Sequence, residues 1–274
     1  MMRVLLTGSS GFIGQALVRA LQAKSAKVGE LGRRRVGAGP FVAWSLGDPV
    51  AADFLGGFDA IVHLAHDSAG EAGARRTVEG TVALASAAQA AGIGRQVFLS
   101  SYSAGPQAIS AYGRTKTELE TFFLKQPGAV IVRPGLVLGE GGIFGRIARV
   151  AQCWPITVLP DGGRGAVPVI DLPTLIDALA TVLSSDAAPA EVNAFFPKMS
   201  SLRELVLQAA AVAGHRVVIV PVPSAPVLWG MQIVEWVGIR LPVTSDSLRG
   251  FIANQRAAHV SSLTAAGRLI ESSR

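Results

Sequence analysis

The sequence predicts an α/β protein with a doubly wound parallel sheet and a smaller C-terminal region for a substrate. Three observations support this fold class. Short apolar runs alternate with helical patterns over the first half of the chain, which is typical of a parallel sheet covered by helices on both faces. A glycine-rich turn follows the first apolar run. Half of the 274 residues are apolar and only 16% are charged, which indicates much buried sheet.

The N-terminal segment joins a strand, a glycine turn and a helix. Residues 3–6 form an apolar run, and glycines follow at Gly8, Gly11 and Gly14. Apolar residues then recur over residues 12–21 at the spacing of a helix face. Gly8 permits the tight turn, Gly11 lets the backbone approach a diphosphate, and Gly14 lets the helix lie close to the sheet. The free N–H groups at the helix start favour phosphate, so the segment predicts a dinucleotide site, with a plain structural turn as the alternative.

The remaining elements follow from the same patterns, punctuated by glycine and proline. The expected strands are residues 27–33, 41–44, 59–66 running into a loop, 95–101, 129–133 and 217–222. The expected helices are residues 72–91, 112–125, a short one ending near 152, 172–184 with Asp171 as its cap, and 202–213. Residues 159–165 are expected to form a loop. So is the segment after residue 222, because prolines at 221, 223 and 226 interrupt it.

This pattern predicts two regions. The dinucleotide-binding unit comprises residues 1–139 and about 167–187, and the smaller substrate-binding region comprises about 140–166 and 188–274. Trp229 and Trp236 fall in the smaller region, and we expect them in its core rather than on a partner-binding surface. The region carries few charges, which favours an apolar ligand; they are chiefly Asp161, Arg164, Glu235 and Arg240.

Composition limits the classes of partner. The net charge is +6, but the one dense basic run, residues 33–35, has no interleaved aromatics, so nucleic acid is not expected as a partner. The single cysteine, Cys153, excludes an internal disulfide and fits a cytoplasmic location. His63 and His66 lack the further ligands of a zinc site, so no metal is expected. Neither a signal peptide nor a membrane span is expected, and the predicted partner is a small-molecule substrate.

The end of the second strand bears on the choice of cofactor. An acidic residue there holds the ribose 2′-hydroxyl of NAD. This sequence instead places Gly32 at that point, followed by Arg33 and Arg34. Guanidinium groups beside a missing carboxylate suit a 2′-phosphate, so NADP is predicted in preference to NAD. Glu30 is close enough to leave NAD open, and a solvated basic loop is a further alternative.

Tyr112 and Lys116 are four residues apart, on one face of a predicted helix. A free phenol has a pKa near ~10, and a nearby ammonium together with the charge of an oxidised nicotinamide favours the phenolate. Such a tyrosine exchanges a proton with a carbinol oxygen while hydride moves to or from the cofactor, and Lys116 can also hydrogen-bond a ribose. Ser100 and Ser101 end the fifth strand at the carboxyl edge of the sheet, where ligands bind. Either hydroxyl can hold the substrate oxygen or simply cap a turn.

Five motifs in this order resemble the extended and atypical short-chain dehydrogenase/reductases, the NAD-dependent epimerase/dehydratase group. They are residues 7–14, His63-Leu64-Ala65-His66, Ser100-Ser101, Tyr112 with Lys116, and Arg133-Pro134-Gly135. The resemblance implies a Rossmann-type fold and the catalytic residues Ser101, Tyr112 and Lys116, with Ser103 in reserve. The expected cofactor contacts, which include the two arginines after the second strand, are Gly8, Ser10, Gly11, Phe12, Ile13, Gly14, Arg33, Arg34, Leu46, Leu64, Ala65, His66, Tyr112, Lys116, Pro134, Gly135 and Val137.

The chain departs from the family pattern at Ser45-Leu46, where an Asp-Leu pair is usual, and at Thr77, where an Asn is usual. The activity that the resemblance implies is NAD(P)-dependent reduction or oxidation of a carbonyl/alcohol substrate. A nucleotide-sugar epimerase or dehydratase is the alternative among enzymes. A non-catalytic NADP-binding sensor or assembly protein is the alternative outside them. A homodimer through helices 72–91 and 112–125 is implied by analogy alone.

Overall fold

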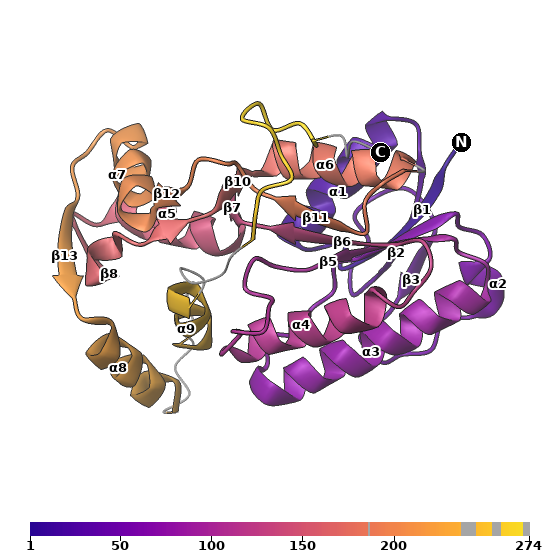
Figure 1. Cartoon of the computed structure of the whole chain (residues 1–274), viewed down its shortest axis with the longest axis horizontal. Helices are drawn as coiled ribbons and strands as arrows, with labels where there is room; N and C mark the ends of the chain where they lie inside the picture. Colours follow the sequence, from indigo (N-terminus) through magenta and orange to yellow (C-terminus); the bar gives the residue numbers. More distant parts are fainter. Residues whose placement is uncertain (186, 237–244, 254–258, 271–274) are drawn as a thin grey trace.

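The computed structural model describes residues 1–185, 187–236, 245–253 and 259–270. Its centre is a parallel sheet of seven strands in the order β11-β6-β5-β4-β1-β2-β3 (Figure 1). These strands are β1 (Arg3–Thr7), β2 (Lys27–Gly32), β3 (Phe41–Ala43), β4 (Ala60–His63), β5 (Arg95–Leu99), β6 (Ala129–Pro134) and β11 (Glu191–Ala194). The predicted doubly wound α/β fold is therefore confirmed.

Helices cover both faces of this sheet (Figure 1). On one face lie α1 (Phe12–Ala23) and α6 (Leu172–Ser184), and on the other lie α2 (Ala52–Leu55), α3 (Gly70–Ala90) and α4 (Ala111–Phe123). Successive strand residues point to opposite faces, so β1 contributes to two cores. Leu6 packs with Leu17 of α1 and Leu179 of α6, whereas Leu5 packs with Leu84 of α3. Burying each such side chain contributes about 1.5–3 kcal/mol.

The remaining elements form a smaller lobe and its connections. They are β7 (Leu136–Leu138), α5 (Gly142–Cys153), β8 (Ile156–Pro160), the short 3-10 turn η1 (Asp161–Gly163), β9 (Ala166–Val167), β10 (Val169–Asp171), β12 (Ser200–Ser201), α7 (Leu202–Val212), β13 (Val218–Val222), α8 (Ser224–Trp236) and α9 (Ser245–Ala253). Strand β13 pairs in parallel with β8, and the inner face of this pair packs on α5 and α7 through Leu159, Val206 and Val217. In the part of the chain that the structure describes, none of the helices has the length and apolarity needed to cross a bilayer.

Most predicted elements lie close to their expected bounds, and the reasons are local. The helix expected at residues 172–184 has those bounds, and the carboxylate of Asp171 caps it by accepting from the N–H of Thr174 (2.8 Å). Residues 159–165 were expected to form a loop, which is wrong in part. Leu159 and Pro160 end β8, and η1 follows with Gly162 at a φ of +70°.

Two expectations for the C-terminal third are wrong. The segment after β13 is not a loop but helix α8, because Pro226 falls in its first turn, where a missing N–H costs no hydrogen bond. Trp229 of this helix is 68% exposed and therefore not a core residue. The side chain of Trp236 and the residue Arg240 lie outside the described part of the chain.

Strand β11 was not predicted, although it completes the central sheet. It pairs with β6, and the side chains of Val192 and Ala194 are fully buried there. The segment belongs to the range that the sequence assigned to the smaller region. The predicted division, with residues 1–139 and about 167–187 in one region and about 140–166 and 188–274 in the other, stays a proposal.

Candidate active site

The turn after β1 has a shape that only glycine permits at two positions. Gly8 has a φ of +67°, and a Cβ atom there would lie 2.9 Å from the backbone nitrogen of Ala65. A Cβ atom on Gly14 would lie 2.3 Å from the carbonyl oxygen of Gly8. These clearances exclude side chains, so the turn packs backbone against backbone. The hydroxyl of Thr7 fixes this packing by accepting from the N–H groups of Leu64 (3.0 Å) and Ala65 (3.1 Å).

The start of α1 fits a diphosphate. Its N-cap, Gly11, has no side-chain cap among the described residues, which leaves the first N–H groups of the helix to a ligand. The helix dipole adds a partial positive charge at the same point. The fully buried hydroxyl of Ser9 also lacks a hydrogen-bond partner within the described ranges. An open backbone cradle and an unsatisfied polar group beside it fit the phosphates and ribose of a dinucleotide.

Three further residues of this turn were predicted to contact the cofactor. The side-chain amide of Gln15 donates to the carbonyl oxygen of Ser10 (2.9 Å). The ring of Phe12 lies against the glycine loop at 139–142, where a Cβ atom on Gly141 would lie 2.3 Å from a ring carbon. The side chain of Ile13 packs against the core. Phe12 and Ile13 therefore face protein with their side chains and can offer a diphosphate only their backbone N–H groups.

The end of β2 places the basic residues as the sequence predicted. The carboxylate of Glu30 is fully buried and accepts from the N–H groups of Val36 (3.0 Å) and Gly37 (2.6 Å). It thereby holds the following loop and is not placed for a ribose. Arg33 and Arg34 follow the strand with exposed side chains. Arg33 and Arg34 thus bring guanidinium groups next to the strand end, whereas the carboxylate of Glu30 is bonded to the loop.

The loop after β3 holds Leu46, another predicted cofactor contact. Leu46 is half-buried against the core beneath α3. A Cβ atom on Gly80 of α3 would lie 2.6 Å from the nitrogen of Gly47, so the helix and the loop are in close backbone contact. The carboxylate of Asp48 accepts from the N–H of Ser45 (2.7 Å) and closes the loop. The position of Ser45 and Leu46 is therefore fixed by the hydrogen bond to Asp48 and by the close contact between Gly47 and Gly80.

The three predicted catalytic residues meet at the carboxyl edge of the central sheet. Ser101 follows β5, Tyr112 lies in the first turn of α4, and Lys116 lies one turn further on. The hydroxyl of Ser101 lies near enough to the phenol of Tyr112 to lower its pKa, and Ser101 accepts from the N–H of Ser103 (3.1 Å). The Nζ atom of Lys116 lies 5.7 Å from the ring centre of Tyr112. The reserve candidate, Ser103, supports Ser101 through its backbone.

Lys116 is buried, and its surroundings lower its pKa. Its Nζ atom donates to the carbonyl oxygen of Leu99 (2.7 Å) and lies 4.7 Å from the ring centre of Phe98. Burial lowers the pKa of Lys116 to about 8, although the nearby carboxylate of Glu120 acts in the opposite direction. The ammonium is thus held at a fixed place between β5 and α4.

In the protein without its cofactor, the pKa of Tyr112 is raised, whereas the sequence predicted that it would be lowered. Burial raises this pKa, and the hydroxyl of Ser101 lowers it only in part. The expected lowering by Lys116 does not prevail here, because desolvation of the phenolate outweighs it and the ammonium is bonded to a backbone carbonyl. In this state the phenol carries its proton at neutral pH.

His66 adds an imidazole to the site. Its ring meets that of Tyr112 edge-on at 4.9 Å. Its Nδ1 atom is buried and has no hydrogen-bond partner among the residues that the structure places. Burial, followed by the charge of Lys116, lowers the pKa of His66 to about 4, while Asp67 acts against this. A neutral imidazole beside the phenol is therefore available to a ligand. His63 by contrast is a core residue, hydrogen-bonded to Gln96 (2.9 Å).

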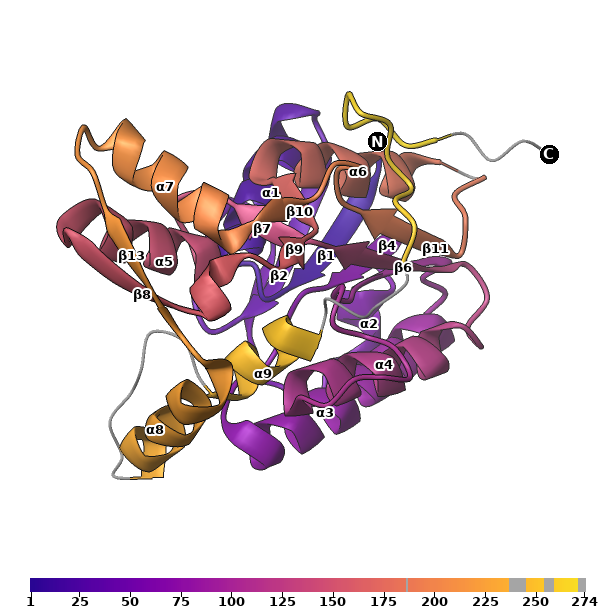
Figure 2. The same cartoon turned by 60° about the vertical axis from the view of Figure 1, so that its left-hand side comes forward.

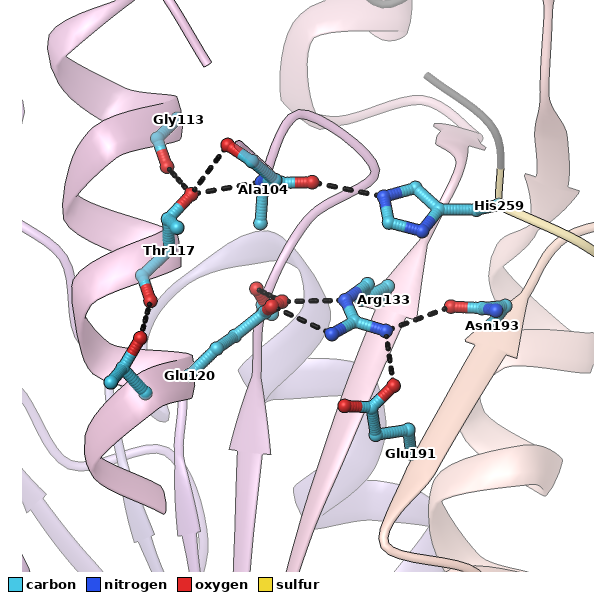
Figure 3. Close-up of polar contacts among 11 residues, drawn as sticks. Ala104, Gly113, Thr117, Glu120, Arg133, Glu191, Asn193 and His259 are labelled. Atoms are coloured by element: carbon cyan, nitrogen blue, oxygen red, sulfur yellow. Dashed lines mark hydrogen bonds and ion pairs between the residues drawn. The ribbon is translucent and has the colours of Figure 1, made fainter. Parts of the chain in front are cut away.

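The structure separates the two strand-end serines. Ser100 is buried and donates to the Oε1 atom of Glu120 (2.5 Å), away from Tyr112. Arg133 binds the same carboxylate through Nε and Nη2, both at 2.7 Å. Figure 3 shows Arg133 between Glu120 of α4 and two residues of β11, namely Glu191 (2.9 Å) and Asn193 (3.3 Å). Ser100 thus belongs to a structural network, and Ser101 is the serine at the site.

The segment after β6 was predicted to lie near the nicotinamide. Pro134 ends β6, and a Cβ atom on Gly135 would lie 2.5 Å from the carbonyl oxygen of Pro168. Val137 is half-buried and packs against the core on the α1 side of the sheet. These residues occupy the same edge of the sheet as Ser101, because β5 and β6 are parallel neighbours.

Sequence reasoning missed the C-terminal residues that hold α4, the helix of the predicted catalytic residues Tyr112 and Lys116. The carboxylate of Asp246 in α9 accepts from the N–H groups of Ala111 (2.9 Å) and Tyr112 (3.3 Å). Ser110 completes the cap by accepting from the N–H of Gly113 (3.0 Å). The imidazole of His259 is hydrogen-bonded to the carbonyl of Ala104, which follows Ser101 (Figure 3). No spacing in the sequence links a residue so distant to Tyr112.

The comparison with known families shows the family to which the chain belongs. A model of the NAD dependent epimerase/dehydratase family matches residues 4–190, which include the glycine turn and the Ser-Tyr-Lys cluster. The chain belongs to this family. The resemblance drawn from the five motifs is therefore confirmed. Members of this family are NAD-dependent enzymes, and NAD(P) binding agrees with the cradle at the start of α1.

Individual relatives extend this result. Ceramide reductase from Caulobacter vibrioides is 34% identical over 164 residues, which are 53% of this chain and 51% of that protein. The chain thus spans about half the length of this curated relative. The NAD-dependent NDP-hexosamine 5,6-dehydratase TunA has a TM-score of 0.68 at 19% identity, covering 94% of this chain and 99% of its own. A short-chain dehydrogenase/reductase superfamily protein from Agrobacterium tumefaciens with bound NAD has a TM-score of 0.66 at 24% identity, covering 93% and 97%. The two structures show a shared fold.

Proposed function

We propose that this protein is an NADP-dependent reductase of a carbonyl group in an apolar substrate. The observation that carries the proposal is that Ser101, Tyr112 and Lys116 meet: the Nζ atom of Lys116 lies 5.7 Å from the ring centre of Tyr112, and Ser101 is near enough to act on the pKa of the phenol. This cluster lies at the carboxyl edge of the sheet, the edge that also holds the glycine cradle. Ligands of open α/β sheets bind at that edge.

In this proposal the hydroxyl groups of Ser101 and Tyr112 hold the carbonyl oxygen of the substrate by hydrogen bonds. Bound NADPH would supply a hydride for the carbonyl carbon. Tyr112 gives its proton to the oxygen, which yields the alcohol and leaves a tyrosinate. Ser101 then donates to the tyrosinate, the ammonium of Lys116 lies close enough to favour its charge, and a proton from solvent restores the phenol.

A protonated Tyr112 fits the role of proton donor in reduction, as any phenol would at neutral pH. A buried phenol that keeps its proton at neutral pH is a proton donor. Oxidation of an alcohol needs the phenolate instead, and its formation would then depend on the positive charge of the oxidised nicotinamide. His66, neutral at pH 7 and unpartnered at Nδ1, is placed to hydrogen-bond the ligand beside Tyr112.

Two observations support an apolar substrate. Residues 141–160 and 205–234 contain no aspartate or glutamate, and basic residues are sparse in both. The relative from Caulobacter vibrioides is named a ceramide reductase. We therefore place the substrate of this chain among ketones that carry long acyl chains, and prefer this class to nucleotide sugars.

The test is a substrate screen with the purified protein. NADPH fluorescence would first show binding, and the decrease of NADPH absorbance would then be followed with long-chain ketones, short ketones and nucleotide sugars. We expect turnover with the long-chain ketones. Turnover of nucleotide sugars alone would favour the epimerase or dehydratase alternative. Binding of NADPH without oxidation across the panel would favour a sensor or assembly protein.

Replacement of Arg33 and Arg34 tests the cofactor preference. We expect Arg33→Ala/Arg34→Ala to raise the Kd for NADPH about tenfold to a hundredfold, because one or two charge-assisted bonds to the 2′-phosphate are lost. The Kd for NADH should stay unchanged. Arg35→Ala is the matched control, since the guanidinium of Arg35 lies over the ring of Phe41 at 5.5 Å. A wild-type protein that binds NADH more tightly than NADPH would contradict the assignment.

Two further expectations stay predictions. A homodimer would use α3 and α4, which lie side by side on one face of the sheet (Figure 1). The prediction of a cytoplasmic location rests on there being a single cysteine, Cys153, in the sequence.

A further inference from the structure

The outer face of the β8–β13 pair is apolar and exposed. Val218 pairs with Ile156 and Val220 pairs with Val158, so all four side chains lie on one face. Their exposed fractions are 63%, 58%, 38% and 53%. The alternate residues point inward to α5 and α7. We call these four side chains, together with Trp154, the outer patch. Trp154, next to β8, is 64% exposed.

The outer patch stands apart from the catalytic cluster. In both views β8 and β13 lie beside α5 and α7 at one side of the molecule (Figure 1, Figure 2), and Figure 1 shows them at the end opposite α2. Soluble proteins rarely gather large aliphatic and tryptophan side chains on one exposed face without a binding role. The proposed catalytic residues do not use this face, so its function is separate.

The charges near the outer patch are mostly basic; the exposed carboxylate of Asp161 directly follows β8 and accepts from the N–H of Ser224 (3.1 Å). Arg149 and Arg146 line a surface hollow next to Trp154, together with Val150 and Cys153. Arg216 is exposed and precedes Val218 by two residues. The nearest acidic residues along the chain are Glu140, Asp161, Glu204 and Glu235. An apolar face bordered by arginines, within segments that lack carboxylates, is complementary to a surface that is apolar inside and anionic outside.

From this arrangement we infer that the outer patch docks the protein on an anionic phospholipid bilayer. Trp154 takes the place between headgroups and acyl chains that tryptophan prefers, and the aliphatic side chains of β8 and β13 enter the boundary beside it. Arg149 and Arg216 meet lipid phosphates. Affinity for such a surface grows with buried apolar area and with attraction to anionic lipid. The inference is independent of the proposed reductase activity.

Vesicle sedimentation with the full chain tests the inference. Wild-type protein should bind vesicles of phosphatidylcholine with about 30% phosphatidylglycerol, and bind pure phosphatidylcholine more weakly. Raised salt should weaken the binding. Ile156→Ser/Val218→Ser should reduce it at least tenfold. Arg149→Glu should also reduce it at least tenfold, because it changes the charge by two and each charge near the surface is worth about fivefold. Leu124→Ser is the control, because Leu124 is 52% exposed but follows α4.

The outcomes separate the explanations. Equal binding by the double variant and by Leu124→Ser would overturn the inference, as would absence of binding to anionic vesicles. Arg149→Glu provides a second, single-site readout if the double variant melts below wild type. Light scattering is run in parallel: a dimer that the double variant abolishes, without vesicle binding by wild type, would assign the outer patch to a second copy of the chain instead.

Discussion

Tyr112→Phe is expected to lower kcat for carbonyl reduction by two to four orders of magnitude, the usual contribution of a general acid. The variant keeps the ring that meets His66 at 4.9 Å and removes only the hydroxyl near Ser101. The Kd for NADPH should remain close to that of wild type, since the cradle is built from α1 and the turn before it. Single-turnover kinetics and NADPH titration would measure the two quantities separately.

Tyr102→Phe is the matched control, because Tyr102 is the other of the two tyrosines in the chain. Its ring packs edge-on against Phe195 and His259, a contact that phenylalanine retains. We expect this variant to turn over at nearly the wild-type rate. If Tyr112→Phe were as active as Tyr102→Phe, Tyr112 would not be the proton donor.

The pH profile should report Lys116. Its pKa is lowered to about 8, so its ammonium is lost as the pH rises through this value. Reduction also needs the protonated phenol, whose raised pKa keeps it available throughout. We expect kcat/KM, which reports groups of the free enzyme, to be level near neutrality and to fall as the pH passes about 8. Lys116→Arg should move this fall to higher pH, since guanidinium stays charged. If the loss of activity at alkaline pH occurred at the same pH in Lys116→Arg, it would be caused by the titration of another group.

The parts of the fold that sequence could predict depend on local signals. The core strands are short apolar runs, and glycines such as Gly8 and Gly14 mark turns where no side chain fits. Strand β11 escaped prediction because its four residues, Glu191–Ala194, contain two polar side chains and gain stability from pairing with β6. Helix α8 escaped because Pro226 breaks a helix interior but not a first turn.

The site shows the same division between local and distant causes. The spacing of Tyr112 and Lys116 is local, so sequence could predict that they share a helix face. The choice of Ser101 over Ser100 rested on resemblance, and its physical reason is that Glu120 binds the hydroxyl of Ser100. Asp246 caps α4 from 134 residues away. The raised pKa of Tyr112 is likewise a property of burial, which spacing does not reveal.

Arg133→Met is expected to lower the free energy of unfolding by about 3–5 kcal/mol, the cost of leaving a buried charge without its partner. Glu120 and Arg133 are each less than a tenth exposed, and their two bonds of 2.7 Å hold α4 against β6. In the variant the carboxylate of Glu120 would keep Ser100 as its donor and Lys116 as a nearby cation, but it would lose the two bonds from Arg133. Urea denaturation followed by circular dichroism would measure the loss.

Two further variants separate the buried charge from the loss of packing. Glu191→Gln removes the half-exposed partner of Arg133 and should cost less than about 1 kcal/mol, as is usual for an exposed ion pair. The double variant Glu120→Leu/Arg133→Met removes both buried charges, so it should be more stable than Arg133→Met alone. Equal stability of the single and double variants would show that Arg133 acts by packing, and that the ion pair between α4 and β6 adds nothing to the fold.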